Sequence, residues 1–64
     1  MTKHPDITVS LTKYKNNHFM LMRSCISSLK QYGLEHEVER FIFETNFHTC
    51  AQIIEIARSW FTVI

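Results

Sequence analysis

Glycine and proline are scarce in this 64-residue sequence, which has one of each. All-β and loop-rich folds need these residues at their turns, so their scarcity predicts long regular elements. Cysteine is scarce too. Cys25 and Cys50 are too few for the disulfide framework of a small secreted domain, and we expect reduced thiols, although one disulfide between two helices stays geometrically possible.

Long hydrophobic runs are absent as well. Residues 1–20 contain no continuous apolar segment of the kind found in a signal peptide, and no run approaches the roughly 18 residues of a membrane span. The expected protein is soluble and cytoplasmic, in a bacterium or in whatever cell hosts its gene, and has no membrane partner.

Charge is unevenly distributed along the chain. Residues 1–33 carry five lysines and arginines against one aspartate, a net +4, whereas residues 34–64 carry two arginines against five glutamates, a net −3. The two halves could pair within one fold or across an antiparallel dimer. Unrelated solvated faces are the alternative, since exposed ion pairs contribute only about 0–1 kcal/mol each.

The pattern predicts an all-α fold of three short helices forming a compact bundle. Residues 1–10 are expected to be a flexible N-terminal arm, with at most a short extended piece near 7–9, and residues 11–64 a single helical domain. The first helix begins between Ser10 and Asn17, both acceptable N-caps, and ends at Gly33 in a Schellman motif.

The second and third helices follow with very short links. The second is expected from about Leu34 to Thr45 or Asn46. The third begins with the capping box Thr49-x-x-Gln52 and runs almost to residue 64.

The third helix is the most apolar segment. As a helix, residues 50–64 place nine apolar side chains on an arc of roughly 180°, whereas an ordinary surface helix has a stripe of ~100°. So wide a face needs two neighbours, and we expect one of them to be a second copy of the chain. The self-association residues that this homodimer predicts are Ile53, Ala57, Trp60, Phe61 and Ile64.

A second surface is predicted on the middle helix. Phe43 points away from the core stripe and lies near His36 and Phe47. Aromatic residues are enriched at the cores of protein interfaces, so these three residues are candidates for binding a partner protein.

No pattern of residues indicates catalysis or a cofactor. Cys25, His36, His48 and Cys50 are zinc-ligand types, but their spacing lacks the paired knuckles of a structural zinc site. Serines lie on a polar helix face, and three small helices leave little room for a cleft. We therefore expect no enzyme activity, no metal and no cofactor.

The alternative function is a small DNA-binding transcriptional regulator of helix-turn-helix type, because the second and third helices have suitable lengths. The third helix offers only Gln52 and Arg58 as readers of bases, and the second helix is acidic. Nucleic acid is therefore an unlikely partner on this reading.

Taken whole, the sequence resembles the small early-region proteins encoded in the exo-xis region of lambdoid bacteriophages. The resemblance rests on size, the helical pattern and the stretch Lys13-Tyr-Lys-Asn-Asn-His-Phe-Met-Leu-Met22. It implies a non-enzymatic accessory protein in the host cytoplasm, which binds and modulates a host or phage regulatory protein. Such a role in host takeover would interfere with the host cell cycle and bias development toward lysis over lysogeny.

Overall fold

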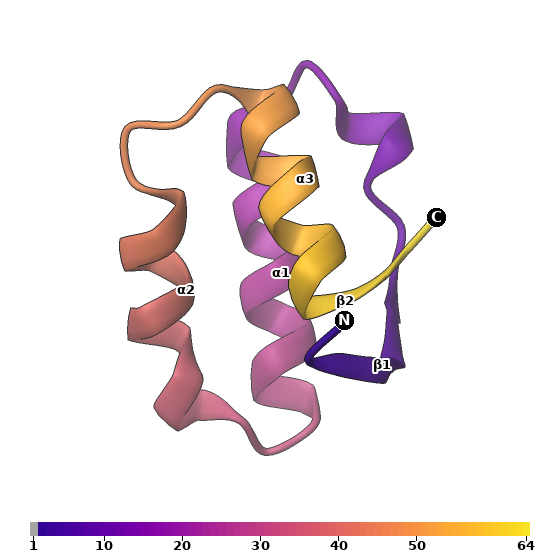
Figure 1. Ribbon diagram of the computed structural model, residues 1–64, viewed down its shortest axis with the longest axis vertical. Coiled ribbons are helices and arrows are strands. Elements are labelled where there is room, and N and C mark those ends of the chain that lie inside the picture. The colour runs from indigo at the N-terminus through magenta and orange to yellow at the C-terminus, as the bar shows by residue number, and fades with distance from the viewer. Residues whose placement is uncertain (1) are drawn as a thin grey trace.

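The computed structural model describes residues 2–64, which form three α-helices and a pair of short strands (Figure 1). In chain order the elements are β1 (His4–Val9), a 3-10 turn η1 (Thr12–Tyr14), α1 (His18–Gln31), a second 3-10 turn η2 (Glu35–Glu37), α2 (Val38–Thr45), α3 (Cys50–Trp60) and β2 (Phe61–Val63). The three helices pack side by side, and the strands lie on the side of α1 and α3 opposite α2.

The prediction of an all-α fold is wrong, because the two ends of the chain pair as a parallel two-stranded sheet. The Ile64 N–H donates to the Val9 carbonyl at 3.0 Å, and the Leu11 N–H donates to the Ile64 carbonyl at 2.9 Å. The segment that was expected to be a flexible arm therefore contains an element of the fold. The result is a small mixed α/β globule.

The third helix is shorter than predicted and ends at Trp60. Phe61 adopts extended backbone angles, with φ −135° and ψ 169°. The three residues that follow it, Thr62, Val63 and Ile64, are all β-branched, and such side chains favour extended backbone over helix. The spacing of apolar residues alone does not distinguish a last helical turn from a short strand at residues 61–64.

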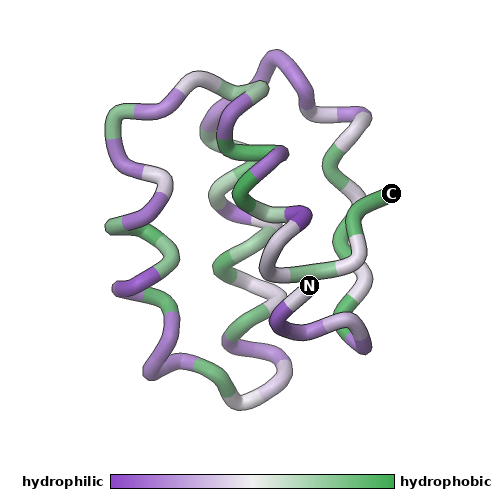
Figure 2. The backbone as a smooth tube through the Cα atoms, in the orientation of Figure 1, coloured by the Kyte–Doolittle hydropathy of each residue, from purple (hydrophilic) through white to green (hydrophobic). Residues whose placement is uncertain are grey.

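The apolar face of α3 is covered from within the chain. Eleven buried apolar residues form one core, drawn from both strands and all three helices: Ile7, Val9, Leu11, Leu21, Cys25, Leu29, Phe41, Ile53, Ala57, Trp60 and Phe61. The Trp60 ring meets Phe41 edge-on, with centroids 5.2 Å apart. Figure 2 shows hydrophobic and hydrophilic residues alternating along all three helices, as expected of helices that bury one side.

This core removes the argument for a homodimer through α3. Four of the five residues predicted to self-associate, Ile53, Ala57, Trp60 and Phe61, are at most 2% exposed in a single chain. Within one chain, the paired strands supply the second cover that the wide apolar face needs. Ile64 alone of the five is exposed.

Several local signals are confirmed. Gly33 has φ +74°, and the bonds from Leu34 N–H to Leu29 O and from Gly33 N–H to Lys30 O form the predicted Schellman motif. Thr49 and Gln52 form the predicted capping box. Helix α1 uses the later of its two candidate caps, because the Asn17 side chain accepts from the Met20 N–H.

Replacing Ile7 tests whether β1 belongs to the core. Ile7→Ala should lower the free energy of unfolding by about 2–4 kcal/mol, and Ile7→Val by about 1 kcal/mol, because Ile7 is buried in the apolar core. Urea unfolding followed by circular dichroism measures both, with the exposed neighbour Thr8→Ala as the control. Equal stabilities for all three variants would mean that the segment is a free arm.

Candidate functional site

The turn between α2 and α3 holds a phenylalanine in an unfavourable conformation. Asn46 has φ −62° and ψ 136°, Phe47 has φ +61°, and the His48 N–H donates to the Thr45 carbonyl at 3.3 Å. These features define a type II β-turn, whose third position is ordinarily glycine because a side chain there is strained. A positive φ at a bulky residue costs roughly 1–3 kcal/mol.

Two buried or local contacts hold this turn. The Thr45 hydroxyl is buried and donates to the Phe41 carbonyl at 2.9 Å, which fixes the end of α2. Nδ1 of His48 lies 2.7 Å from the Asn46 carbonyl, and since a carbonyl only accepts, Nδ1 carries the hydrogen. These bonds hold the backbone of the turn from which the Phe47 side chain projects.

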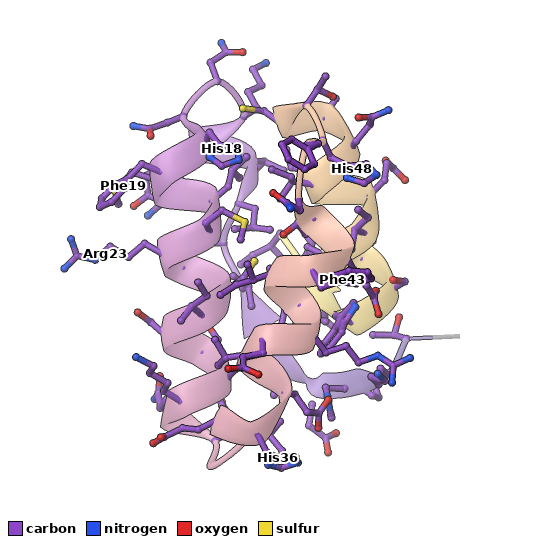
Figure 3. The ribbon with its side chains drawn as sticks, turned by 90° about the vertical axis from the view of Figure 1, so that its left-hand side faces the viewer. His18, Phe19, Arg23, His36, Phe43 and His48 are labelled. Atoms are coloured by element: carbon purple, nitrogen blue, oxygen red, sulfur yellow. The ribbon has the colours of Figure 1, made fainter. Side chains whose placement is uncertain are left out.

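Phe47 and Phe43 are among the most exposed apolar side chains of the described residues. Phe47 is 99% exposed and Phe43 is 80% exposed, so neither gains stability from burial in the fold. Figure 3 shows Phe43 and His48 on the same side of α2, toward α3. His36, the third predicted residue, lies at the opposite end of α2, so the structure does not bring it together with the phenylalanines.

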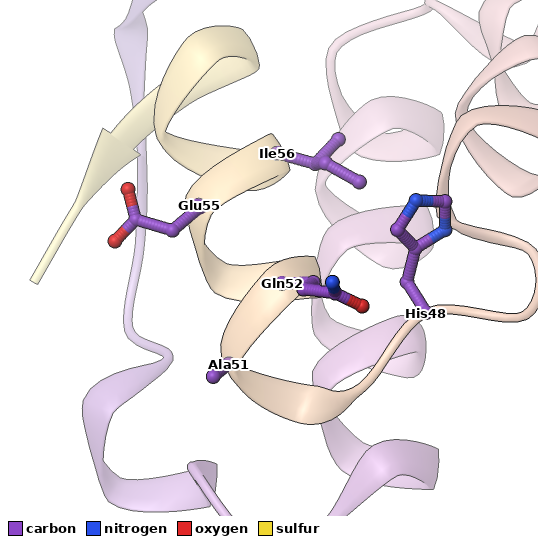
Figure 4. Close-up of a pocket in the computed structure, with 5 residues that line it drawn as sticks. All are labelled: His48, Ala51, Gln52, Glu55 and Ile56. Atoms are coloured by element: carbon purple, nitrogen blue, oxygen red, sulfur yellow. The ribbon is translucent and has the colours of Figure 1, made fainter.

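A shallow groove adjoins the turn on the outer side of α3 (Figure 4). It is lined by His48, Ala51, Gln52, Glu55 and Ile56. Ala51 and Ile56 supply apolar surface, and the other three supply hydrogen-bonding groups. We call this groove together with Phe43 and Phe47 the α2–α3 surface.

Sequence reasoning did not identify the groove. The sequence pattern places Ile56 among the apolar residues of the third helix and Gln52 in a capping box. It identifies His48 only as a residue type that can bind zinc. The groove depends on how the turn places His48 beside α3, and no spacing in the sequence signals that placement.

A chain of polar contacts fixes the positions of α2 and α3 beneath this surface. The Trp60 indole N–H donates to Glu44 at 2.9 Å, and Arg40 donates to the other oxygen of Glu44 at 3.2 Å. These two donors, the indole first, hold the pKa of Glu44 below its usual range. The Lys3 ammonium lies 4.1 Å from the centre of the Trp60 ring and covers it from the N-terminal side.

A second polar contact joins β1 to η2. Nε2–H of His4 donates to Glu37 at 3.0 Å, and this hydrogen bond is the main reason that the pKa of Glu37 is lowered. His36, 72% exposed at its side chain, lies 3.6 Å from the other oxygen of Glu37. His36 is thus an exposed residue beside the His4–Glu37 hydrogen bond.

The groups that could have carried other chemistry are dispersed. Within residues 2–64, no three His, Cys, Asp or Glu side chains gather as metal ligands. Cys25 and Cys50 are free thiols, and burial raises the pKa of Cys25 to about 12, so Cys25 stays protonated at neutral pH. No helix in the described part of the chain has the length and apolarity to cross a membrane.

Comparison of the chain with protein-family models, with curated protein sequences and with solved structures gives no match. Function has to be argued from the α2–α3 surface itself.

Phe47→Gly should stabilise the fold. The change removes the strain of the positive φ and loses no buried surface, so the free energy of unfolding should rise by about 1 kcal/mol. Phe47→Ala is the matched control, since it removes the ring but keeps a Cβ at the strained position, and should change stability little. A glycine variant less stable than the alanine variant would show that the turn is not strained.

Acid should destabilise the fold through Glu37 and Glu44. Both pKa values are lowered in the folded chain, so the stabilisation is complete above the unfolded glutamate pKa, near 4.3, and is lost as pH falls below it. Urea midpoints measured from about pH 7 to about pH 3 should fall steeply in the acid range. Glu44→Gln should flatten this fall, whereas Glu39→Gln should not; identical profiles for the two variants would contradict the assignment.

Proposed function

We propose that this chain is a non-enzymatic accessory protein that binds and modulates a regulatory protein through the α2–α3 surface. The observation that carries the proposal is Phe47, a fully exposed aromatic ring held in a strained turn. Strain at an exposed residue contributes nothing to folding, and such strain clusters at functional sites. A glycine would serve the turn better, so the ring is better explained by binding than by stability.

The geometry suits insertion of the rings into an apolar pocket of a partner. Burying one exposed phenylalanine is worth about 1.5–3 kcal/mol, and aromatic residues dominate the binding energy of many interfaces. Phe47 is already held by the hydrogen-bonded turn, so binding costs little additional ordering of its backbone. Two such exposed rings would supply most of the affinity of a modest interface.

The groove would supply selectivity. Gln52 offers an amide, Glu55 a carboxylate and His48 the second nitrogen of its imidazole, since Nδ1 is engaged by Asn46. A partner that leaves these groups unpaired loses affinity, because a buried polar group without a hydrogen bond costs about 1–3 kcal/mol. Exposed apolar rings, together with a mainly apolar groove that carries a few hydrogen-bonding groups, favour a folded protein as the partner.

The resemblance to early proteins of lambdoid phages supplies the proposed setting. The partner would be a host or phage regulatory protein in the host cytoplasm. Its modulation would interfere with the host cell cycle and bias development toward lysis. The size of the chain and the exposed aromatic surface support this setting.

The helix-turn-helix alternative has less support. The outward side of α3 carries Arg58 as its single cation, and Arg58 lies 3.7 Å from Glu55. A recognition helix needs free donors that face base edges. Besides Arg58, this helix offers only Gln52, whose oxygen accepts from the Thr49 N–H and whose NH2 group is left as a donor, so the face has few groups to read bases.

The test is affinity capture from lysate of a lambdoid-phage host, comparing three forms of the chain. Phe43→Ala combined with Phe47→Gly should lose the bound protein, with Kd raised at least a hundredfold for the purified pair, while the fold is no less stable. Tyr32→Ala is the matched control, since Tyr32 is an aromatic residue that is 54% exposed and lies outside the α2–α3 surface. A partner retained by the double variant, or lost equally by the control, would overturn the proposal.

A further inference from the structure

Five cations of the described residues have no carboxylate at ion-pair distance; Lys3 covers the Trp60 ring, and the other four lie on α1 and the segment just before it. Residues 7–34 contain Lys13, Lys15, Arg23 and Lys30 and no aspartate or glutamate. Within residues 2–64 none of these four cations lies at ion-pair distance from a carboxylate, whereas Arg40 and Arg58 each pair with a glutamate. These four cations therefore lie on α1 and the segment before it without being neutralised by a nearby carboxylate.

The exposed side of α1 carries this charge along a single stripe. Four exposed residues at spacings of four, four and three share one side of the helix: Phe19, Arg23, Ser27 and Lys30. We call these four the α1 outer face. In Figure 3, Phe19 and Arg23 point away from α2, on the side of the molecule opposite Phe43 and His48. Lys13 and Lys15 lie at the end where α1 begins.

We propose that the α1 outer face binds duplex DNA, with α1 in the major groove. The groove is about 12 Å wide and admits an α-helix, and α1 is 14 residues long. Arg23 and Lys30 would contact base edges or phosphates, and the small Ser27 between them lets the helix approach closely. Phe19 would meet a thymine methyl group, and Lys13 and Lys15 would meet backbone phosphates.

The residue types favour DNA over an acidic protein. Lysine and serine are depleted at protein interfaces, where arginine and aromatic residues are enriched, so Arg23 and Phe19 would suit either partner whereas Ser27 and Lys30 do not suit a protein. The α1 outer face has one aromatic ring among its four side chains, and no acidic group that would repel phosphate. Arginine, lysine and serine are the donors that position proteins on the DNA backbone.

This contact is independent of the proposed protein-binding surface. The two lie on opposite sides of the molecule, so one chain could hold DNA by α1 while its α2–α3 surface engages a partner. It also differs from the helix-turn-helix reading, which would place α3 in the groove.

Fluorescence anisotropy with a labelled duplex of about 20 base pairs tests the proposal. Four phosphate contacts predict a slope of log K against log salt of about −3.6, which is roughly a hundredfold loss of affinity between 50 and 200 mM salt. The double variant Arg23→Gln with Lys30→Gln should bind about tenfold or more weakly at low salt, with a slope smaller by about 2.

The matched control is Arg40→Gln with Arg58→Gln, which removes the same net charge from α2 and α3 and should leave Kd within about twofold. Circular dichroism checks that both pairs fold. The double variant Phe43→Ala with Phe47→Gly should bind DNA as tightly as the unchanged chain. A failure of the DNA-binding proposal can therefore be told apart from a failure of the protein-binding proposal. Several results would overturn the DNA assignment: no binding at low salt, equal losses in the two pairs, or tighter binding to the single strand or to polyglutamate.

Discussion

The pairing of the two chain ends is the constraint on which this fold depends. Helix α3 has more apolar surface than α1 and α2 can cover, and a 64-residue chain has few other residues to cover it. Strand β1 supplies the cover by pairing with β2, which places Ile7 and Val9 in the core beside Trp60 and Phe61. Without this pairing the apolar face would need a second chain. With it, the core is closed, and the remaining exposed rings lie outside the core.

Short-range signals in the sequence predicted their structures correctly. Gly33 and the Thr49–Gln52 pair end and begin helices through bonds within a few residues, so their patterns suffice. The sheet could not be predicted in the same way. Its bonds join residues at opposite ends of the chain, Pro5 and Asp6 argue against a strand, and β2 has three residues whose apolar spacing also fits a helix. The expectation of a dimer followed from the same misassignment, because it left the apolar face of the third helix without cover inside the chain.

The candidate site was partly predictable for the same reason. Helical geometry alone placed Phe43 off the core stripe of the second helix, and the structure leaves its ring exposed. The positive φ of Phe47 and the groove beside His48 depend on the turn between two helices. The residue pair Asn46-Phe47 does not predict a type II turn, because Phe47 stands at the third position, where such a turn ordinarily has glycine. The two faces that remain, aromatic on α2–α3 and basic on α1, are compatible with a small protein that works by binding.

Amide hydrogen exchange at Leu11 and Ile64 tests the closure of the core most directly. Both amides donate across the β1–β2 pair, to Ile64 O and Val9 O, and neither is protected by a helix. The account predicts that they exchange as slowly as amides in the middle of α1, because opening them requires uncovering Trp60 and Phe61. Exchange at the rate of an unstructured chain would show that the ends are not paired, and that the apolar face of α3 needs a different cover.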